Sequence, residues 1–183
     1  VTHEDLSKHI LINTNDPING IDDDENGYVD DYYGYNFLNS TVTTGNNNIA
    51  DDKGHGTQMG GIIAAETNNK IGISGISSKA TLLIVKTLDS KGNGTQYDAA
   101  QGIIYAVDRG ARIINCSGGY RAYNEILKDA IDYADSKGAI IFSAVGNDGQ
   151  NIVNYPAAFE KVLGIGSISL KDDTRSYFSN YND

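Results

Sequence analysis

The chain has 183 residues, of which 39% are hydrophobic and 21 are glycine, a composition that predicts one turn-rich α/β domain over residues 1–183. Its formal net charge of −10 argues against nucleic acid or an anionic membrane as a partner, whereas acidic loops suit bound cations. The single cysteine excludes an internal disulfide, and no apolar run approaches the roughly 20 residues that span a bilayer.

An acidic loop at residues 22–31 is the first informative segment. Oxygen ligands at alternating positions, with Gly27 at the turn, give the spacing of an EF-hand calcium loop. The position where such a loop carries a glutamate is occupied by Tyr33, so Asp31 or a water would substitute there. The alternative is a solvated acidic loop without an ion. The candidate ligands are Asp22, Asp24, Asn26, Tyr28 through its carbonyl oxygen, Asp30 and Asp31.

A single histidine, His55, stands between two glycines at the start of an apolar segment that predicts a helix through a packed core. Imidazole titrates near neutral pH, so a histidine at a helix start that faces a cleft is suited to accept and return a proton. The alternative is a surface histidine in a turn.

Residues 81–87 form a continuous run of leucine and β-branched residues, which predicts a strand covered on both faces of a parallel sheet. Thr95, with Asp98 three residues later, predicts the start of a helix that Gly110 ends. A second short strand is predicted at residues 112–115.

The alternation then repeats. A helix is predicted up to Lys137-Gly138, and strands are predicted at 139–143 and 162–168. This order predicts a doubly wound, mostly parallel sheet with helices on both faces, in which ligands bind beyond the carboxyl ends of the strands. The apolar face of the helix consists of Ile126, Leu127, Ala130, Ile131 and Ala134.

Four segments resemble, in order and spacing, the central region of subtilisin-like serine proteases. They are GHGTQMGGIIAA (54–65), IINCSGGY (113–120), FSAVGNDG (142–149) and NYPAAFEKVLGIGSISLKDDTRSYFSNY (154–181). Their succession on an alternating β/α background makes coincidence improbable. The resemblance covers nearly the whole chain and implies the central part of a subtilisin-like catalytic domain, incomplete at both ends.

The resemblance implies two catalytic residues. His55 corresponds to the general base, and Asn147 corresponds to the oxyanion-hole asparagine, whose amide faces the charge that develops on the attacked carbonyl oxygen. Without the resemblance, Asn147 also fits a glycine-flanked asparagine in a left-handed turn.

A substrate cleft is implied in the same way. Residues 117–119 correspond to one wall of the primary specificity pocket and residues 92–94 to the facing segment, so that a peptide adds between them as a strand. Asn154 corresponds to the pocket floor, and Asp148 to a rim position where an acid favours a basic side chain. The implied substrate-binding residues are Gly92, Asn93, Gly94, Ser117, Gly118, Gly119, Ala144, Gly146 and Asn154.

A second calcium loop and a cis peptide bond also follow from the resemblance. The bond is Tyr155-Pro156, next to the pocket. The implied calcium ligands are Asp5 and Asn69 through their side chains, and Thr67, Ile71 and Ile73 through their carbonyl oxygens. The sequons at Asn39 and Asn93 matter only in a secretory pathway that glycosylates.

The Asp-containing and Ser-containing motifs of the family's catalytic triad do not occur in the 183 residues. We therefore expect part of a secreted or cell-surface, calcium-stabilised endopeptidase that acts on polypeptides, inactive as this chain alone, whose partners include a pro-segment or the missing parts of its own domain. One alternative is an inactive relative that binds a peptide or pro-segment. A nucleophilic role for Cys116 is a third reading, against which a buried, inert thiol is favoured.

Overall fold

The computed structural model describes residues 2–38 and 45–182, which form two compact units, Val1–Gly102 and Ile103–Asp183. We call them unit 1 and unit 2 and describe each by itself. The sequon at Asn39 lies outside the described residues. Within the described ranges, the chain has no helix of the length and apolarity needed to cross a membrane.

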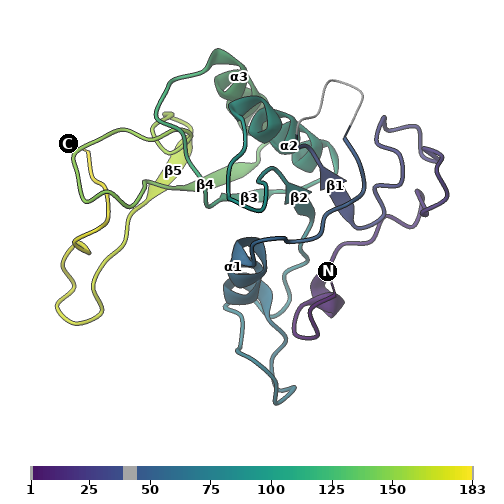
Figure 1. The fold of residues 1–183 in the computed structure, drawn as a ribbon, viewed down its shortest axis with the longest axis horizontal. Helices are drawn as coiled ribbons and strands as arrows, with labels where there is room; N and C mark the ends of the chain where they lie inside the picture. The colour runs from purple at the N-terminus through teal and green to yellow at the C-terminus, as the bar shows by residue number, and fades with distance from the viewer. Residues whose placement is uncertain (1, 39–44, 183) are drawn as a thin grey trace. The chain divides into compact units, whose positions relative to one another are not determined.

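Unit 1 is built around a small parallel sheet. The strands β1 (Gly34–Asn36) and β2 (Ile84–Lys86) pair in register from Gly34 opposite Ile84 to Asn36 opposite Lys86 (Figure 1). β1 is buried throughout, whereas β2 is half-buried and shorter than the predicted run at 81–87.

Two helical segments and an aromatic cluster complete unit 1. The 3-10 helix η1 spans Ser7–His9, and α1 spans His55–Ala64. The rings of Tyr28, Tyr35 and Phe37 meet edge to face with centroids 5.1 to 5.7 Å apart, so the core lies beside β1. The prediction that α1 runs through a packed core is wrong for unit 1, since Ala64 is its one buried residue.

The helix α2 (Gln96–Asp108) has the predicted ends. The backbone N–H of Asp98 donates to Thr95 Oγ1, and the Thr95 N–H donates to the Asp98 carboxylate, so the reciprocal capping pair is confirmed. At the other end, Gly110 has φ 86°, and the N–H of Ala111 bonds back to Ala106, which closes the last turn.

Unit 2 is a three-stranded parallel sheet covered by a helix. The strands β3 (Ile113–Cys116), β4 (Ile140–Ala144) and β5 (Val162–Ile165) lie in the order β3-β4-β5, and α3 (Glu125–Ser136) packs against β4 (Figure 1). Parallel strands that alternate with helices confirm the predicted α/β class. The strands of the described residues fall into two sheets rather than one.

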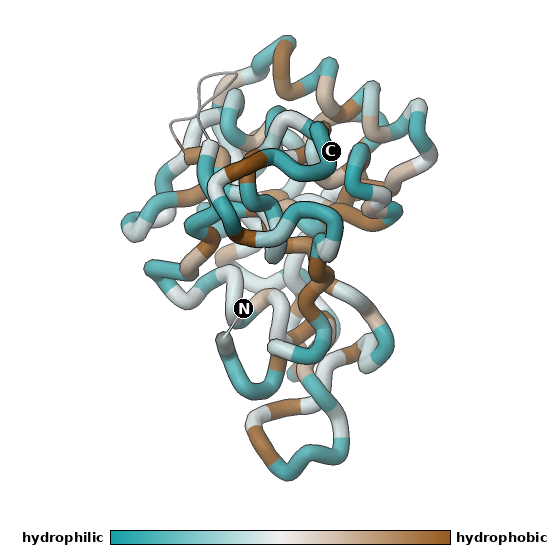
Figure 2. The backbone as a smooth tube through the Cα atoms, turned by 90° about the vertical axis from the view of Figure 1, so that its right-hand side faces the viewer, coloured by the Kyte–Doolittle hydropathy of each residue, from teal (hydrophilic) through white to brown (hydrophobic). Residues whose placement is uncertain are grey.

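The apolar stripe of α3 is narrower than predicted. Leu127, Ala130, Ile131 and Ala134 are buried, whereas Ile126 is 52% exposed, because it lies one position outside the i, i+3, i+4, i+7 spacing. Hydrophobic and hydrophilic residues accordingly follow one another along the helices at the top of Figure 2.

The two faces of the unit 2 sheet differ in burial. The face toward α3 holds the buried Ile141, Ser143 and Val162. The opposite face is apolar and open, with Ile113 68% exposed. Strands of a parallel sheet are ordinarily covered on both faces, and among the described residues of unit 2 this face has no covering layer. The other exposed apolar residues of this face are Ile140, Leu163 and Ile165.

Candidate active site and cation-binding loops

His55 is the first residue of α1. Gly54 precedes it in the left-handed conformation, with φ 85° and ψ −8°, which turns the chain into the helix. The residue is half-buried and stands at the positive end of the helix dipole.

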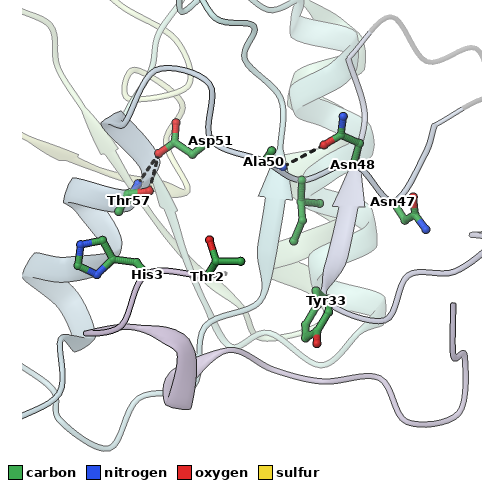
Figure 3. Close-up of a pocket in the computed structure, with 9 residues that line it drawn as sticks. Thr2, His3, Tyr33, Asn47, Asn48, Ala50, Asp51 and Thr57 are labelled. Carbon is green, nitrogen blue, oxygen red and sulfur yellow. Dashed lines mark hydrogen bonds between the residues drawn. The ribbon is translucent and has the colours of Figure 1, made fainter.

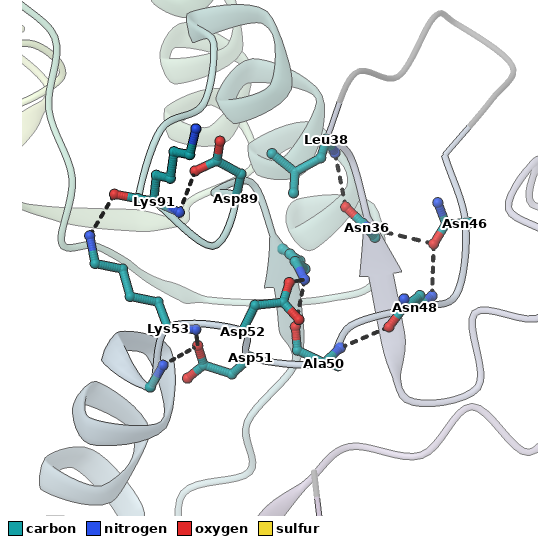
Figure 4. Close-up of polar contacts among 12 residues, drawn as sticks. Asn36, Leu38, Asn46, Asn48, Ala50, Asp51, Asp52, Lys53, Asp89 and Lys91 are labelled. Atoms are coloured by element: carbon teal, nitrogen blue, oxygen red, sulfur yellow. Dashed lines mark hydrogen bonds and ion pairs between the residues drawn. The ribbon is translucent and has the colours of Figure 1, made fainter.

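The carboxylate of Asp51 holds the start of α1 (Figure 4). It accepts the backbone N–H groups of Lys53 and Gly54, together with the N–H and hydroxyl groups of Thr57 at 2.7 Å each. Partial burial raises the pKa of Asp51, but the hydrogen bonds from Thr57 and the backbone outweigh it and lower that pKa to about 2. Asp51 therefore acts as a charged cap that fixes the backbone on both sides of His55.

Two lysines tie the segment before His55 to neighbouring elements of unit 1 (Figure 4). Lys86, at the end of β2, donates to the carbonyl oxygen of Ala50 at 2.6 Å and forms an ion pair with Asp52. Lys53 donates to the carbonyl oxygen of Lys91 at 2.7 Å. The histidine is thus placed at the carboxyl end of a parallel strand, where ligands bind in such sheets.

The predicted substrate segment Gly92-Asn93-Gly94 lies in a turn closed by Asp89. The Asp89 carboxylate accepts the backbone N–H groups of Lys91 and Asn93 at 2.8 Å each. These backbone hydrogen bonds, led by that of Asn93, hold the pKa of Asp89 below its ordinary value. The segment is joined to the His55 loop through Lys53.

A cavity of about 500 Å³ opens beside the start of α1 (Figure 3). Its wall includes Tyr33 and also His3, which the sequence analysis did not connect with a site. Asp51 and Thr57 line the same cavity, so it adjoins the helix start that carries His55. The remaining lining residues are Thr2, Asn47, Asn48, Ile49 and Ala50.

In unit 2, Asn147 lies exposed on a turn immediately after β4. The preceding Gly146 has φ 104°, and a Cβ atom there would overlap the side-chain nitrogens of Asn154 and Asn180. Both of these amides donate to the carbonyl oxygen of Val145, at 2.9 Å and 3.1 Å. The side-chain carboxamides of Asn154 and Asn180 therefore hold the turn that presents Asn147.

The structure also brings together the predicted pocket residues of unit 2. A Cβ atom on Gly119 would lie 3.6 Å from the Cβ of Asn154, which places the 117–119 segment beside the predicted floor. Tyr120 and Tyr155 exchange backbone hydrogen bonds at 2.7 Å and 2.8 Å, and the Tyr155-Pro156 bond is cis as predicted. The 117–119 wall and the predicted floor thus meet at the carboxyl ends of β3 and β4.

The charge of Asp148 is paired. Its Oδ2 accepts the side-chain amide of Asn180 at 2.9 Å and lies 2.6 Å from Arg121 Nη2. The hydrogen bond from Asn180, followed by the charge of Arg121, holds the pKa of Asp148 below its ordinary value. A rim carboxylate already neutralised by Arg121 attracts a basic substrate side chain less than a free one does.

The acidic loop of unit 1 gathers three carboxylates. One oxygen each of Asp16, Asp22 and Asp24 lies within 4.8 Å of the others. Asp16 is fully buried and accepts the backbone N–H groups of Asp23 and Asp31, so it is fixed in place. Like charges this close repel one another, and hard oxygen donors at irregular spacing suit calcium.

The predicted ligands of this loop divide into two groups. Asn26 donates to the buried carboxylate of Asp31, and Asn13 bridges Asp24 and Asp31, so these residues lie together. The carboxylate of Asp30 instead accepts the N–H groups of residues 19 and 20 at 2.8 Å each. The Tyr28 N–H bonds to Asn26 Oδ1 at 2.8 Å.

The second predicted calcium loop surrounds one buried carboxylate. Asp5 accepts the side-chain amide of Asn69 at 2.6 Å and the backbone N–H of Ile73 at 3.2 Å. Asn69 therefore presents its amide nitrogen to Asp5, and cation binding through this side chain requires the amide to turn over. The remaining predicted ligands, Thr67 and Ile71, flank Asn69 in the same loop.

Two residues that take part in the candidate sites escaped the sequence analysis. Asp16 stands six residues before Asp22 in a polar segment, and Asn180 follows a serine and a phenylalanine near the end of the chain. Both are asparagine or aspartate residues next to predicted site segments, which is too common a pattern in loops to single them out.

Cys116 does not have the environment of a nucleophile. The residue as a whole is half-buried, but burial raises the pKa of its thiol to about 11. The thiol is therefore protonated at neutral pH, whereas a reactive cysteine needs the thiolate.

Solved structures of proteases share this fold. Sphericase is 31% identical with a TM-score of 0.72, and the match covers 80% of this chain and 51% of that chain. The structure of patellamide maturation protease PatA is 32% identical with a TM-score of 0.64, over 70% and 48% of the two chains. Residues 1–183 match the Subtilase family, and the chain belongs to this family.

Curated relatives support the same family assignment. Thermitase of Thermoactinomyces vulgaris is 40% identical over 148 residues, which are 81% of this chain and 51% of the relative. The cell wall-associated protease of Bacillus subtilis (strain 168) is 42% identical over 148 residues, 81% of this chain and 16% of the relative. The chain therefore spans about half or less of the length of these relatives.

Proposed function

We propose that the chain supplies the general base and the oxyanion donor of a calcium-stabilised serine endopeptidase that hydrolyses peptide bonds through an acyl-enzyme. Membership of the Subtilase family supports hydrolysis of peptide bonds as the class of reaction. The observation that carries the proposal is the turn after β4, which presents Asn147 on a backbone held by Asn154 and Asn180. A preorganised amide is what stabilisation of an oxyanion requires.

In the proposed reaction, His55 accepts the proton of a serine hydroxyl contributed from outside residues 1–183 and later returns it to the leaving amine. The capped helix start, held by Asp51 and Lys86, fixes the histidine backbone. Asn147 donates its side-chain amide to the oxygen that becomes negative in the tetrahedral intermediate. His55 belongs to unit 1 and Asn147 to unit 2.

The substrate is proposed to be an extended polypeptide. The 92–94 and 117–119 segments contain glycines, which allow close approach of a peptide backbone and main-chain pairing that tolerates many sequences. Because Arg121 neutralises Asp148, we propose a pocket with no strong preference for a basic side chain. A secreted or cell-surface location is supported by the relative named as cell wall-associated.

Calcium is the proposed structural ion. The donor set of Asp16, Asp22 and Asp24 fits it, because one carboxylate oxygen of each lies within 4.8 Å of the others and calcium prefers such oxygen donors. Bound there, the ion would relieve the repulsion between these carboxylates and fix a loop without regular secondary structure. Asp5 and the 67–73 loop form the second proposed site.

The test is proteolysis by the full-length gene product. We expect it to cleave a denatured protein substrate, and His55→Ala to lower kcat on the order of a million-fold. Residues 1–183 alone should show no turnover. Peptide binding by a full-length protein that never cleaves would instead support an inactive, peptide-binding relative, and turnover unaffected by His55→Ala would reject the proposal.

A further inference from the structure

A buried asparagine outside the predicted site holds the turn that carries Asn147. The side chain of Asn180 is 2% exposed, and all of its polar atoms point at residues 145–150. Its Oδ1 accepts the backbone N–H groups of Asp148 at 2.8 Å and of Gln150 at 3.4 Å. Its Nδ2 donates to the carbonyl oxygen of Val145 at 3.1 Å and to the Asp148 carboxylate at 2.9 Å.

Backbone groups next to Asn180 also form hydrogen bonds with the turn at residues 145–150. The Asn180 N–H donates to the carbonyl oxygen of Gly146 at 3.0 Å, and the N–H of Gly149 donates to the carbonyl oxygen of Phe178 at 2.7 Å. On the far side, the N–H of Tyr181 donates to the carbonyl oxygen of Gln150 at 3.2 Å. The turn is therefore bonded to residues 178–181 both before and after Asn147.

Gly146 shows how tightly the two parts fit. It has φ 104°, and any side chain there would overlap the amide nitrogens of Asn154 and Asn180. The two carboxamides thus fill the space under the turn. Asn154 contributes one hydrogen bond to it, at Val145, whereas Asn180 spans it from Val145 to Gln150.

We propose that Asn180 is a positioning residue for oxyanion stabilisation: it fixes the backbone conformation that aims the Asn147 amide at the developing charge. This inference rests on the proposed function. An oxyanion donor stabilises the transition state only if it is held in place before the reaction, so loosening the turn reduces kcat more than it changes KM. The role is positional, because the side chain of Asn180 is buried and its polar atoms bond to residues 145–150.

The first experiment uses the full-length protein and needs no activity. Amide hydrogen exchange is measured for wild type, Asn180→Ala and Asn182→Ala, an exposed asparagine two residues further on. We expect Asn180→Ala to speed exchange at Asp148 and Gln150 by about tenfold or more, with the amides of α3 unchanged. Exchange in the turn equal to wild type would overturn the inference.

The second experiment is a double-mutant cycle in the full-length protease. Asn180→Ala should lower kcat about tenfold or more with little change in KM, and Asn182→Ala should not. In an Asn147→Ala background, Asn180→Ala should have almost no further effect on kcat, because the group it positions is gone. An equal loss of kcat in both backgrounds would show that Asn180 acts only through general stability and would refute the inference.

A swap of the paired side chains keeps the test valid if the alanine variant folds poorly. Asp148→Asn combined with Asn180→Asp exchanges amide and carboxylate, so one side chain still donates to the other. We expect the swap to recover part of the kcat that Asn180→Asp alone loses, because that single change leaves two carboxylates facing each other. If Asn147→Ala itself leaves kcat unchanged, the proposed function fails; if only the Asn180 variants do, this inference alone fails.

Discussion

In the acidic loop of unit 1, carboxylate groups are held close together. In the 145–150 turn of unit 2, by contrast, neutral side-chain carboxamides hold the backbone. Asp16 and Asp31 are buried among further acids, while the turn is held by the neutral amides of Asn154 and Asn180, of which Asn180 also donates to the carboxylate of Asp148. A cluster of buried carboxylates needs a cation, and a pair of carboxamides needs only its hydrogen bonds. We therefore predict that the stability of the protein depends on calcium and that the conformation of the 145–150 turn does not.

Removal of the Asn147 amide tests the catalytic side of this contrast and has the largest expected effect. In the full-length protease, Asn147→Ala should lower kcat by about 100- to 1,000-fold, with a small change in KM, because the donor acts mainly in the transition state. The melting temperature should stay within a few degrees of wild type, since Asn147 is exposed. Steady-state kinetics and thermal unfolding of the same preparations decide this, and a loss confined to KM would contradict it.

Removal of calcium tests the stability side. In excess chelator, we expect the melting temperature to fall by about 10 °C, since an ion at 1,000 times its Kd stabilises by about 4 kcal/mol and about 1 kcal/mol shifts Tm by 2–4 °C. Amide exchange in the 145–150 turn should not change at a temperature where both forms are folded.

Asp16→Asn sharpens that measurement. The variant should lose most of the chelator-dependent shift, because one of the three converging carboxylates is gone. The matched control is Asp129→Asn, an exposed aspartate on α3, which should keep the full shift. Identical chelator responses in both variants would remove the acidic loop as the calcium site.

The ion pair at the rim of the oxyanion turn predicts a smaller effect on specificity. Arg121→Gln leaves Asp148 without its cationic partner, so kcat/KM for substrates with lysine or arginine before the scissile bond should rise by about two- to fivefold relative to those with leucine. Arg112→Gln, at an exposed arginine before β3, serves as the control. An unchanged ratio of the two kcat/KM values would show that Asp148 does not face the substrate side chain.

Asp51 represents a third kind of environment, in which N–H and O–H groups alone donate hydrogen bonds to a carboxylate. Its contribution to the free energy of unfolding is the smallest effect that we predict. Its folded pKa of about 2 lies below the ordinary value of 3.8, so the unfolded chain binds its proton more readily. The stabilisation is therefore present above about pH 4 and is lost as the pH falls toward 2. Because Asp51 is exposed, solvent screening keeps it below about 1 kcal/mol.

Urea unfolding of wild type and Asp51→Asn between pH 2 and pH 6 measures this contribution. The difference in unfolding free energy should be positive at pH 6 and disappear near pH 2. A difference that does not depend on pH would mean that the hydrogen bonds, and not the charge, stabilise the start of α1.

The sequence predicts the local elements of this molecule well, because their signals are local. Spacing alone predicts the Thr95 and Asp98 capping pair, the glycine at 110 and the buried stripe of α3 except for Ile126, which is exposed. The strand run at 81–87 was misjudged in length and cover, since both depend on which neighbours a strand finds and not on its own residues.

The residues of the candidate site likewise divide into those that a local sequence motif identifies and those that it does not. His55 and Asn147 stand in recognisable motifs, whereas Asp16 and Asn180 take part through contacts made across 7 to 35 residues of chain. A polar residue in a loop carries no local mark of the partner it will meet. The geometry of the folded units was needed to find them.

The central claim is that His55 serves a serine hydroxyl from outside these residues, and fluorophosphonate labelling of the full-length protein tests it most directly. Peptide mass spectrometry should place the label on one serine outside residues 1–183, and His55→Ala should abolish labelling. A label on a serine within residues 1–183, or labelling that persists in His55→Ala, would contradict the account.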